Sequence, residues 1–244
     1  MMKKYFIVTV MLLVPAFSVS FAQSLGDGKP CDLAATITDV DGNVYHTVSI
    51  GKQCWLKENM RATKFAEGGE IKKDGELSAS EAIYYIPEGD VEQVGYLYNW
   101  AAVNHKAASH AGIQGPCPNG WHVPTDAEWS KLETYTAGIG RYVCGEGESN
   151  ISKALAASSG WFSNQRECAV GTAKESNDAT GFSAIPAGVF NGSFSGKGTT
   201  ANFWTATSAS GTYSYSRSLD YAESTVFRSN DNKKYGLSVR CVMD

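Results

Sequence analysis

The stretch Pro124-Thr125-Asp126-Ala127-Glu128-Trp129 marks the start of the clearest helix in the chain. A threonine followed three residues later by a glutamate is typical of a capping box, in which each side chain binds a free backbone amide near the helix start. Pro124 ends the element that precedes the threonine. Apolar side chains then recur at helical spacing, at Trp129, Leu132 and Tyr135 or Thr136. We therefore expect a helix from Thr125 onward with one face in the core.

Upstream of this helix the pattern is typical of strands. Two alternating runs, Ala35 to Val40 and Val44 to Ile50, are separated by Asp41-Gly42-Asn43. An Asp-Gly pair between alternating runs predicts a β-hairpin. A further strand is expected at Cys54 to Met60, so the first part of the domain should be antiparallel sheet.

Downstream, one more helix and then a series of strands are expected. The helix should run from about Asn150 to Ser158 and stop at Gly160. The expected strands are Gly181–Phe190, Asn202–Ser208, Tyr213–Tyr221, Ser224–Ser229 and Leu237–Val242. Two central helices with strands before and after predict a single α+β domain that ends in a β meander.

The first 22 residues have the three parts of a secretory signal peptide. Lys3 and Lys4 precede an apolar run from Tyr5 to Phe17, and Ser20-Phe21-Ala22 is a cleavage site before Gln23. The apolar run is shorter than the roughly 20 residues of a membrane span, and the residue directly after the cleavage point is Gln23 rather than the cysteine of a lipoprotein. We therefore expect an extracellular or periplasmic protein without a lipoprotein anchor, with an N-terminal segment at 23–34 and the domain at 35–244.

The six cysteines all lie in the part of the chain that would be exported. An even number outside the reducing cytosol predicts disulfides rather than a zinc site. Six cysteines allow fifteen pairings, and the sequence leaves the choice open. We prefer two local bridges and one that joins the last strand to the centre of the chain. These pairs are Cys31 with Cys54, Cys144 with Cys168, and Cys117 with Cys241.

Composition and motifs argue against several classes of function. The formal net charge is −4, so a dedicated nucleic-acid binder is not expected. There is no Gly-x-Ser-x-Gly elbow, and His105 and His110 do not have the spacing of a helical metal pair. We interpret His122 as a buried structural histidine. Asn177-Asp178 and Asn230-Asp231-Asn232 have oxygen ligands suited to calcium, but without an EF-hand loop we expect turns there and no cofactor.

Four stretches of the chain carry a family resemblance. They are Ile50–Met60, Gly95–Trp100, Cys117–Trp129 and Leu237–Val242. Together they resemble the Fibrobacter succinogenes major paralogous domain family, in the right order and over roughly Ala35 to Asp244. The resemblance implies a domain of the kind found in exported proteins of Bacteroidetes and their relatives.

A more remote resemblance is to the C-type-lectin-like fold, in the branch of the formylglycine-generating enzyme. There too a Pro-Thr-x-x-Glu-Trp helix follows a short strand, and a final meander closes on a strand like Leu237–Val242. The Glu-Pro-Asn or Gln-Pro-Asp triplet and the Trp-Asn-Asp run of calcium-dependent sugar binders are absent from this sequence. There is also no counterpart of the paired catalytic cysteines, so the resemblance implies the fold and not the chemistry.

The C-terminal strands carry the candidate ligand-binding residues. These are Trp204, Tyr213, Tyr215, Arg217, Tyr221, Arg228, Asn230 and Asp231. Aromatic and arginine side chains are typical of binding surfaces. Tyr213, Tyr215, Arg217 and Tyr221 share a strand parity with Leu219, which leaves open whether that side is core and whether Trp204 and a loop at Asn230–Asn232 are the exposed contacts.

We therefore expect an exported, non-catalytic binding or adhesion module whose partner is a surface protein or a glycan. Similar lectin-like domains display varied contacts on their terminal strands. Two alternatives remain open at this point. An exported carbohydrate-active enzyme would need a cleft with two carboxyl groups whose pKa values are shifted apart. A structural subunit of a surface assembly would need a self-complementary edge strand.

Export is tested by the mass of the protein secreted from its own cells. We expect Gln23 as the first residue, because the small-x-small site ends at Ala22. Recovery of a secreted chain that still carries Met1 to Ala22 would contradict the assignment.

Overall fold

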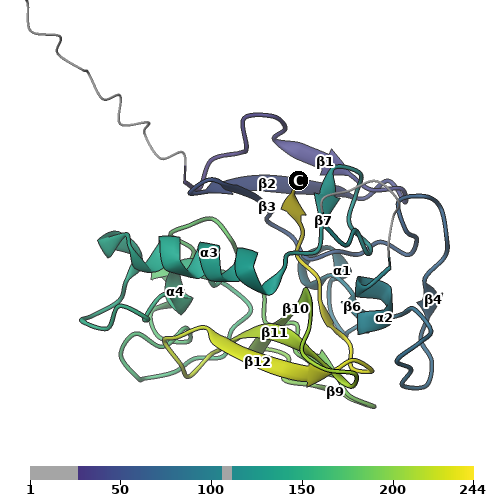
Figure 1. The fold of residues 1–244 in the computed structure, drawn as a ribbon. Coiled ribbons are helices and arrows are strands. Elements are labelled where there is room, and N and C mark those ends of the chain that lie inside the picture. Colours follow the sequence, from purple (N-terminus) through teal and green to yellow (C-terminus); the bar gives the residue numbers. More distant parts are fainter. Residues whose placement is uncertain (1–26, 106–111) are drawn as a thin grey trace, which may run out of the picture.

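The computed structural model describes residues 27–105 and 112–244. The expected signal peptide and His110 lie outside these residues. The described chain forms a five-stranded sheet, a seven-stranded sheet and a two-stranded ribbon, with helices between them (Figure 1). The α+β class is confirmed. None of its helices in the described ranges is long and apolar enough to cross a membrane.

The five-stranded sheet joins the N-terminal hairpin to the final strand. In spatial order its strands are β1 (Thr36–Thr38), β2 (Val44–Ile50), β3 (Gln53–Leu56), β14 (Val242–Met243) and β7 (Trp121–His122). The hairpin pairs as expected, with Ile37 opposite Tyr45. Val242 lies opposite both Trp55 and His122, so β14 is inserted between strands that are far apart in sequence.

The seven-stranded sheet contains the C-terminal meander. Its order is β12 (Phe227–Asn232), β11 (Tyr213–Asp220), β10 (Thr200–Ser208), β13 (Leu237–Ser238), β6 (Leu97–Tyr98), β5 (Ile83–Tyr85) and β4 (Lys72–Lys73). The ribbon consists of β8 (Val189–Phe190) and β9 (Phe194–Ser195). β12 is the outermost strand at one end of this sheet, so one of its edges has no neighbouring strand. Residues on both of its faces are at least partly exposed.

The helices are mostly single turns, with one exception. They are α1 (Val91–Val94), α2 (Trp100–Val103), α3 (Asp126–Ala137) and α4 (Ser152–Leu155), with 3-10 turns at Gly140–Tyr142 and Lys174–Ser176. The capping box of α3 is confirmed, since Thr125 N donates to Glu128 Oε2 at 2.8 Å and Glu128 N donates to Thr125 Oγ1 at 3.2 Å. Trp129, Leu132 and Thr136 are the buried residues of α3.

A cluster of aromatic rings fills the space between α3 and the two sheets. The Trp129 ring lies 5.1 Å from that of Trp55, 5.6 Å from Phe182 and 5.4 Å from Phe203. All four side chains are fully buried. Offset and edge contacts of this kind stabilise aromatic cores beyond their area alone.

Arg240 crosses between the two sheets and is completely buried. Its guanidinium donates to Asn59 Oδ1 at 2.6 Å, to the Leu56 carbonyl at 3.2 Å and to the Phe182 carbonyl at 2.5 Å. Burial lowers the pKa of Arg240 to about 10, which leaves it charged at neutral pH. The charge is held by neutral oxygens and by the faces of the Phe182 and Phe203 rings.

All three preferred disulfides are present. The Cα–Cα distances are 5.9 Å for Cys31–Cys54, 6.0 Å for Cys117–Cys241 and 5.5 Å for Cys144–Cys168. No free cysteine is found, and all six lie in the described ranges. The Cys117–Cys241 bridge links the segment before β7 to the residue before β14, so it fixes the insertion of the last strand. Three disulfides favour an oxidising environment.

Several expected element bounds are wrong, because backbone groups near these bounds form hydrogen bonds with another segment. The second helix ends at Leu155 rather than at Ser158, because Thr180 N and Ala184 N bind the carbonyls of its last residues. Within 181–190 only Val189–Phe190 forms a strand, β8. The expected strand Cys54–Met60 ends at Leu56.

The last two expected strands also differ from the structure. Leu237–Val242 is split between β13 and β14, because the chain passes from one sheet to the other at Arg240. The expected Ser224–Ser229 strand is shifted to Phe227–Asn232. Asn230–Asn232 therefore lies in β12, paired with β11, and the expected loop at these residues is wrong.

Substitution of Trp129 by alanine tests the aromatic cluster. We expect Trp129→Ala to lower the free energy of unfolding by about 3–5 kcal/mol, because it opens a cavity among three other rings. Thermal or urea unfolding measures this loss. Lys131→Ala, on the exposed side of the same helix, is the matched control and should change stability by less than about 0.5 kcal/mol. Equal stabilities of the two variants would contradict the packing role.

Candidate functional site

The antiparallel pairing of β11 and β12 brings several of the expected binding residues onto one face. Tyr213 lies opposite Asn232, Tyr215 opposite Asn230, and Arg217 opposite Arg228. Directly opposed residues of an antiparallel pair project on the same side. We call the part of this side that is at least partly exposed, formed by Tyr213, Tyr215, Arg228, Asn230 and Asn232, the β11–β12 face.

The first turns of α3 support one end of this face from below. Arg217 Nη1 donates to Asp126 Oδ1 at 2.7 Å, and Arg217 Nε also binds Glu133. Arg228 binds the same Asp126 carboxylate through Nε at 2.9 Å and Nη2 at 3.0 Å. Burial opposes ionisation of Asp126, but hydrogen bonds from both arginines outweigh it and lower the pKa of this carboxyl. Asp126 thus fixes both arginines at the helix start.

Above this support, Arg228 is held in place. The Arg228 guanidinium lies 3.9 Å from the centre of the Tyr215 ring, a cation–π contact. Arg228 and Asn230 are exposed, and Tyr213 is 45% exposed. A stacked and bidentate arginine loses little further side-chain entropy when a partner binds. The Arg228 and Tyr215 pair of the β11–β12 face is therefore preorganised.

Four of the expected binding residues do not contribute exposed contacts to this face. Trp204 is fully buried and its Nε1 donates to the Tyr98 carbonyl at 2.7 Å, so its expected exposure is wrong. Arg217 is also fully buried, under α3. Asp231 projects from the opposite side of β12 and accepts a hydrogen bond from Ser216 Oγ at 2.6 Å. Tyr221 follows the end of β11 and lies edge-on to Phe162, 6.4 Å between ring centres.

Sequence reasoning missed the two acidic residues that hold the face. The sequence pattern places Asp126 only within the capping box, and it does not single out Glu133. The two are seven residues apart on α3, a spacing that places them on the same helix face. This spacing is the sequence signal that the two carboxylates bind one basic residue. It does not identify that residue as Arg217.

His122 is buried and bound by hydrogen bonds, as we expected from its position. Its Nδ1 lies 2.6 Å from Asp244 Oδ1 and its Nε2 lies 3.0 Å from Glu128 Oε1. Burial alone would lower the pKa of His122, but the hydrogen bonds to both carboxylates raise it. His105 follows α2 and binds Glu67 at 2.5 Å. The described residues contain no cluster of three or more His, Cys, Asp or Glu side chains that suits a metal ion.

The enzyme alternative requires carboxyl groups that line a cavity. Glu128 and Asp244 line a cavity of about 700 Å³ beside the Cys31–Cys54 bridge. Although burial opposes ionisation of Glu128, its hydrogen bonds with His122 and Thr125 lower its pKa to about 2. A carboxyl group that is ionised at neutral pH cannot act there as a general acid.

The fold and the β11–β12 face together define a class: a disulfide-linked α+β domain with an ordered aromatic and arginine surface on its terminal meander. The model of the Fibrobacter succinogenes major domain (Fib_succ_major) matches residues 48–243. The chain belongs to this family. No curated protein and no solved structure matched the chain.

The His122–Glu128 pair predicts a pH-dependent stability. Glu128 titrates near 4.5 when unfolded and near 2 when folded, so its contribution is complete above pH 4.5 and is lost as the pH falls toward 2. His122 has a raised folded pKa, so its contribution is complete below its unfolded pKa of 6.5 and is lost as the pH rises through the folded value.

Glu128→Gln isolates this charge, because glutamine also fits the third position of a capping box. At pH 5 to 6 we expect the variant to be less stable than the wild type by about 1.5–3 kcal/mol, the range for a hydrogen bond to a charged group. Thermal unfolding at a series of pH values should show this difference shrinking toward pH 2.5. A difference that stays constant over that range would contradict the ionic contribution.

Proposed function

We propose that this protein is an exported, non-catalytic binding or adhesion module that contacts a surface protein or a glycan through its β11–β12 face. The observation that carries the proposal is the arrangement of Arg228, which is clamped by Asp126 and stacked on Tyr215 while still exposed. Rigid aromatic anchors beside an oriented arginine are the composition of binding hot spots. Tyr213 and Asn230 extend the same surface with one large and one adaptable polar contact.

Export is supported by the three disulfides, which suit an extracellular or periplasmic location. The tripartite N-terminal segment with its Ser20-Phe21-Ala22 site supports cleavage before Gln23. Both observations are independent of the ligand.

We also propose that the fold is a C-type-lectin-like one. The support is the capped helix α3 after the short strand β7, together with a final strand that returns to pair beside the N-terminal hairpin. In Figure 1 the C-terminal end lies close to β1, β2 and β7. The residues that bind calcium and sugar in lectins are absent from the sequence, so this proposal concerns the scaffold alone.

The enzyme alternative has one supporting observation. Asp126 and Glu133 flank Arg217, and their pKa values are shifted apart: burial raises that of Glu133, whereas the arginines lower that of Asp126. A pair of carboxyl groups shifted in this way is typical of acid–base sites. Both groups bind Arg217, however, which argues for a supporting role.

A structural subunit assembled through β12 has less support. Edge strands that pair with other chains are usually flat and apolar, whereas β12 has the sequence Phe227-Arg228-Ser229-Asn230-Asp231-Asn232. Charged and polar residues on an edge strand disfavour pairing with another chain.

The proposal is tested on a glycan and protein array with the mature chain, with and without calcium. For a partner found in this way, we expect Tyr215→Ala and Asn230→Ala each to weaken binding about tenfold or more, as at hot spots. Asn191→Ala, an exposed asparagine between β8 and β9, is the matched control. Melting temperatures should stay close to wild type for Asn230→Ala and the control.

Two results would contradict the proposal. One is unchanged affinity of both face variants for the array partner. The other is turnover of a polysaccharide that is lost in Glu133→Gln, because this result would favour the enzyme alternative.

A further inference from the structure

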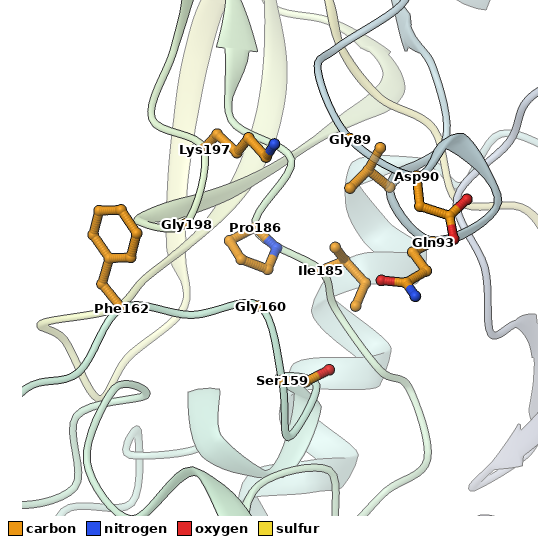
Figure 2. Close-up of a pocket in the computed structure, with 11 residues that line it drawn as sticks. Gly89, Asp90, Gln93, Ser159, Gly160, Phe162, Ile185, Pro186, Lys197 and Gly198 are labelled. Carbon is orange, nitrogen blue, oxygen red and sulfur yellow. The ribbon is translucent and has the colours of Figure 1, made fainter.

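A concave site lies away from the β11–β12 face. It is a pocket of about 370 Å³ between the turn that leads into α1, the segment at 159–162, the segment at 185–186 and the turn at 197–198 that precedes β10 (Figure 2). We propose that this pocket binds a neutral sugar residue. The proposal does not depend on the function of the β11–β12 face, because the two sites share no residue.

One wall of the pocket is an exposed aromatic ring. Phe162 is 58% exposed, yet its position is fixed: a Cβ on Gly198 would lie 2.6 Å from its Cε1, and Tyr221 packs edge-on against it. Ile185 and Pro186 continue the apolar lining. Figure 2 shows Phe162 on one side of Pro186 and Ile185, with Asp90 and Gln93 on the other. The C–H face of a sugar ring would cover this apolar surface.

Polar side chains surround the apolar lining. Among the described residues, the side chains of Gln93, Ser159 and Lys197 have no hydrogen-bond partner. Asp90 uses Oδ1 to accept from Glu92 N at 3.0 Å, which leaves its second oxygen available. In Figure 2 the Lys197 ammonium points across the pocket toward Gly89, and a Cβ on Gly89 would lie 3.1 Å from it. Donors and acceptors thus face the pocket from more than one segment, as neighbouring hydroxyl groups require.

The charge and the volume of the pocket limit the class of ligand that it can bind. The lining contains one carboxylate, Asp90, and one ammonium, Lys197, so their charges cancel. A phosphate, an acidic sugar or an amine would bring a charge with no net counterpart. A volume of about 370 Å³ is near the lower end of the roughly 300–1,000 Å³ of ligand pockets, which suits one or two rings. A neutral molecule with an apolar face and several hydroxyl groups satisfies all of these conditions.

The test uses the full mature chain with intact disulfides and saturation-transfer NMR followed by titration calorimetry. The probes are glucose, galactose, mannose, xylose, N-acetylglucosamine, cellobiose and maltose, with glucuronate, glucosamine and cyclohexanol as counter-probes. We expect at least one neutral sugar to bind saturably and more tightly than all three counter-probes. Phe162→Ala should weaken this binding at least tenfold, and Ser159→Trp, which fills the pocket from an exposed position, should abolish it.

The matched control is Phe194→Ala, which removes a phenylalanine of similar exposure, 44%, on β9 outside the pocket, and should leave sugar binding unchanged. Tyr215→Ala should also leave it unchanged, so failure of this site and failure of the β11–β12 face are distinguishable. The proposal is overturned if no neutral sugar binds, or if a charged sugar or cyclohexanol binds as tightly. It is also overturned if folded Phe162→Ala and Ser159→Trp, confirmed by their melting curves, bind the sugar as the wild type does.

Discussion

The buried guanidinium of Arg240 is the interaction on which the arrangement of the two sheets depends. It lies in the three residues that separate β13 of one sheet from β14 of the other. Its hydrogen bonds reach Asn59 and the carbonyls of Leu56, Phe182 and Ser183, so all five N–H donors have an acceptor. A buried charge without such partners would be strongly destabilising. The segments after β3 and after α4 must therefore meet at this point for the chain to fold.

Helix α3 carries the second organising role, since its N-terminus serves both sheets. Glu128 closes the capping box and binds His122 of β7 in the five-stranded sheet. Asp126, two residues earlier, binds Arg217 and Arg228 of the seven-stranded sheet. Trp129 of the same turn enters the aromatic cluster between them. One turn of helix thus links the core to the proposed binding surface and holds Arg228 in position there.

The proposed surface and the proposed sugar pocket lie toward opposite ends of β11. Tyr213 begins the strand, while Tyr221, just after its end, contacts the pocket residue Phe162. The proposed binding surface lies on two paired strands and presents aromatic and arginine side chains. The pocket is concave, with a balanced charge, and suits a small neutral ring.

By itself the sequence determined what depends on local chemistry. The capping box sets the start of α3, Asp41-Gly42 sets the hairpin, and cysteine parity predicts an oxidised domain. The tertiary structure decided what depends on distant partners. Leu237–Val242 divides between two sheets because Arg240 donates hydrogen bonds to carbonyls that are distant in sequence. Helix α4 ends at Leu155 because backbone amides within residues 180–184 bind its last carbonyls. Strand parity placed Tyr213, Tyr215 and Arg217 on one side of β11. Helix α3 covers part of that side, so Arg217 is buried whereas Tyr213 is exposed. The reason is that the burial of a strand residue depends on what packs against the strand and not on the strand itself.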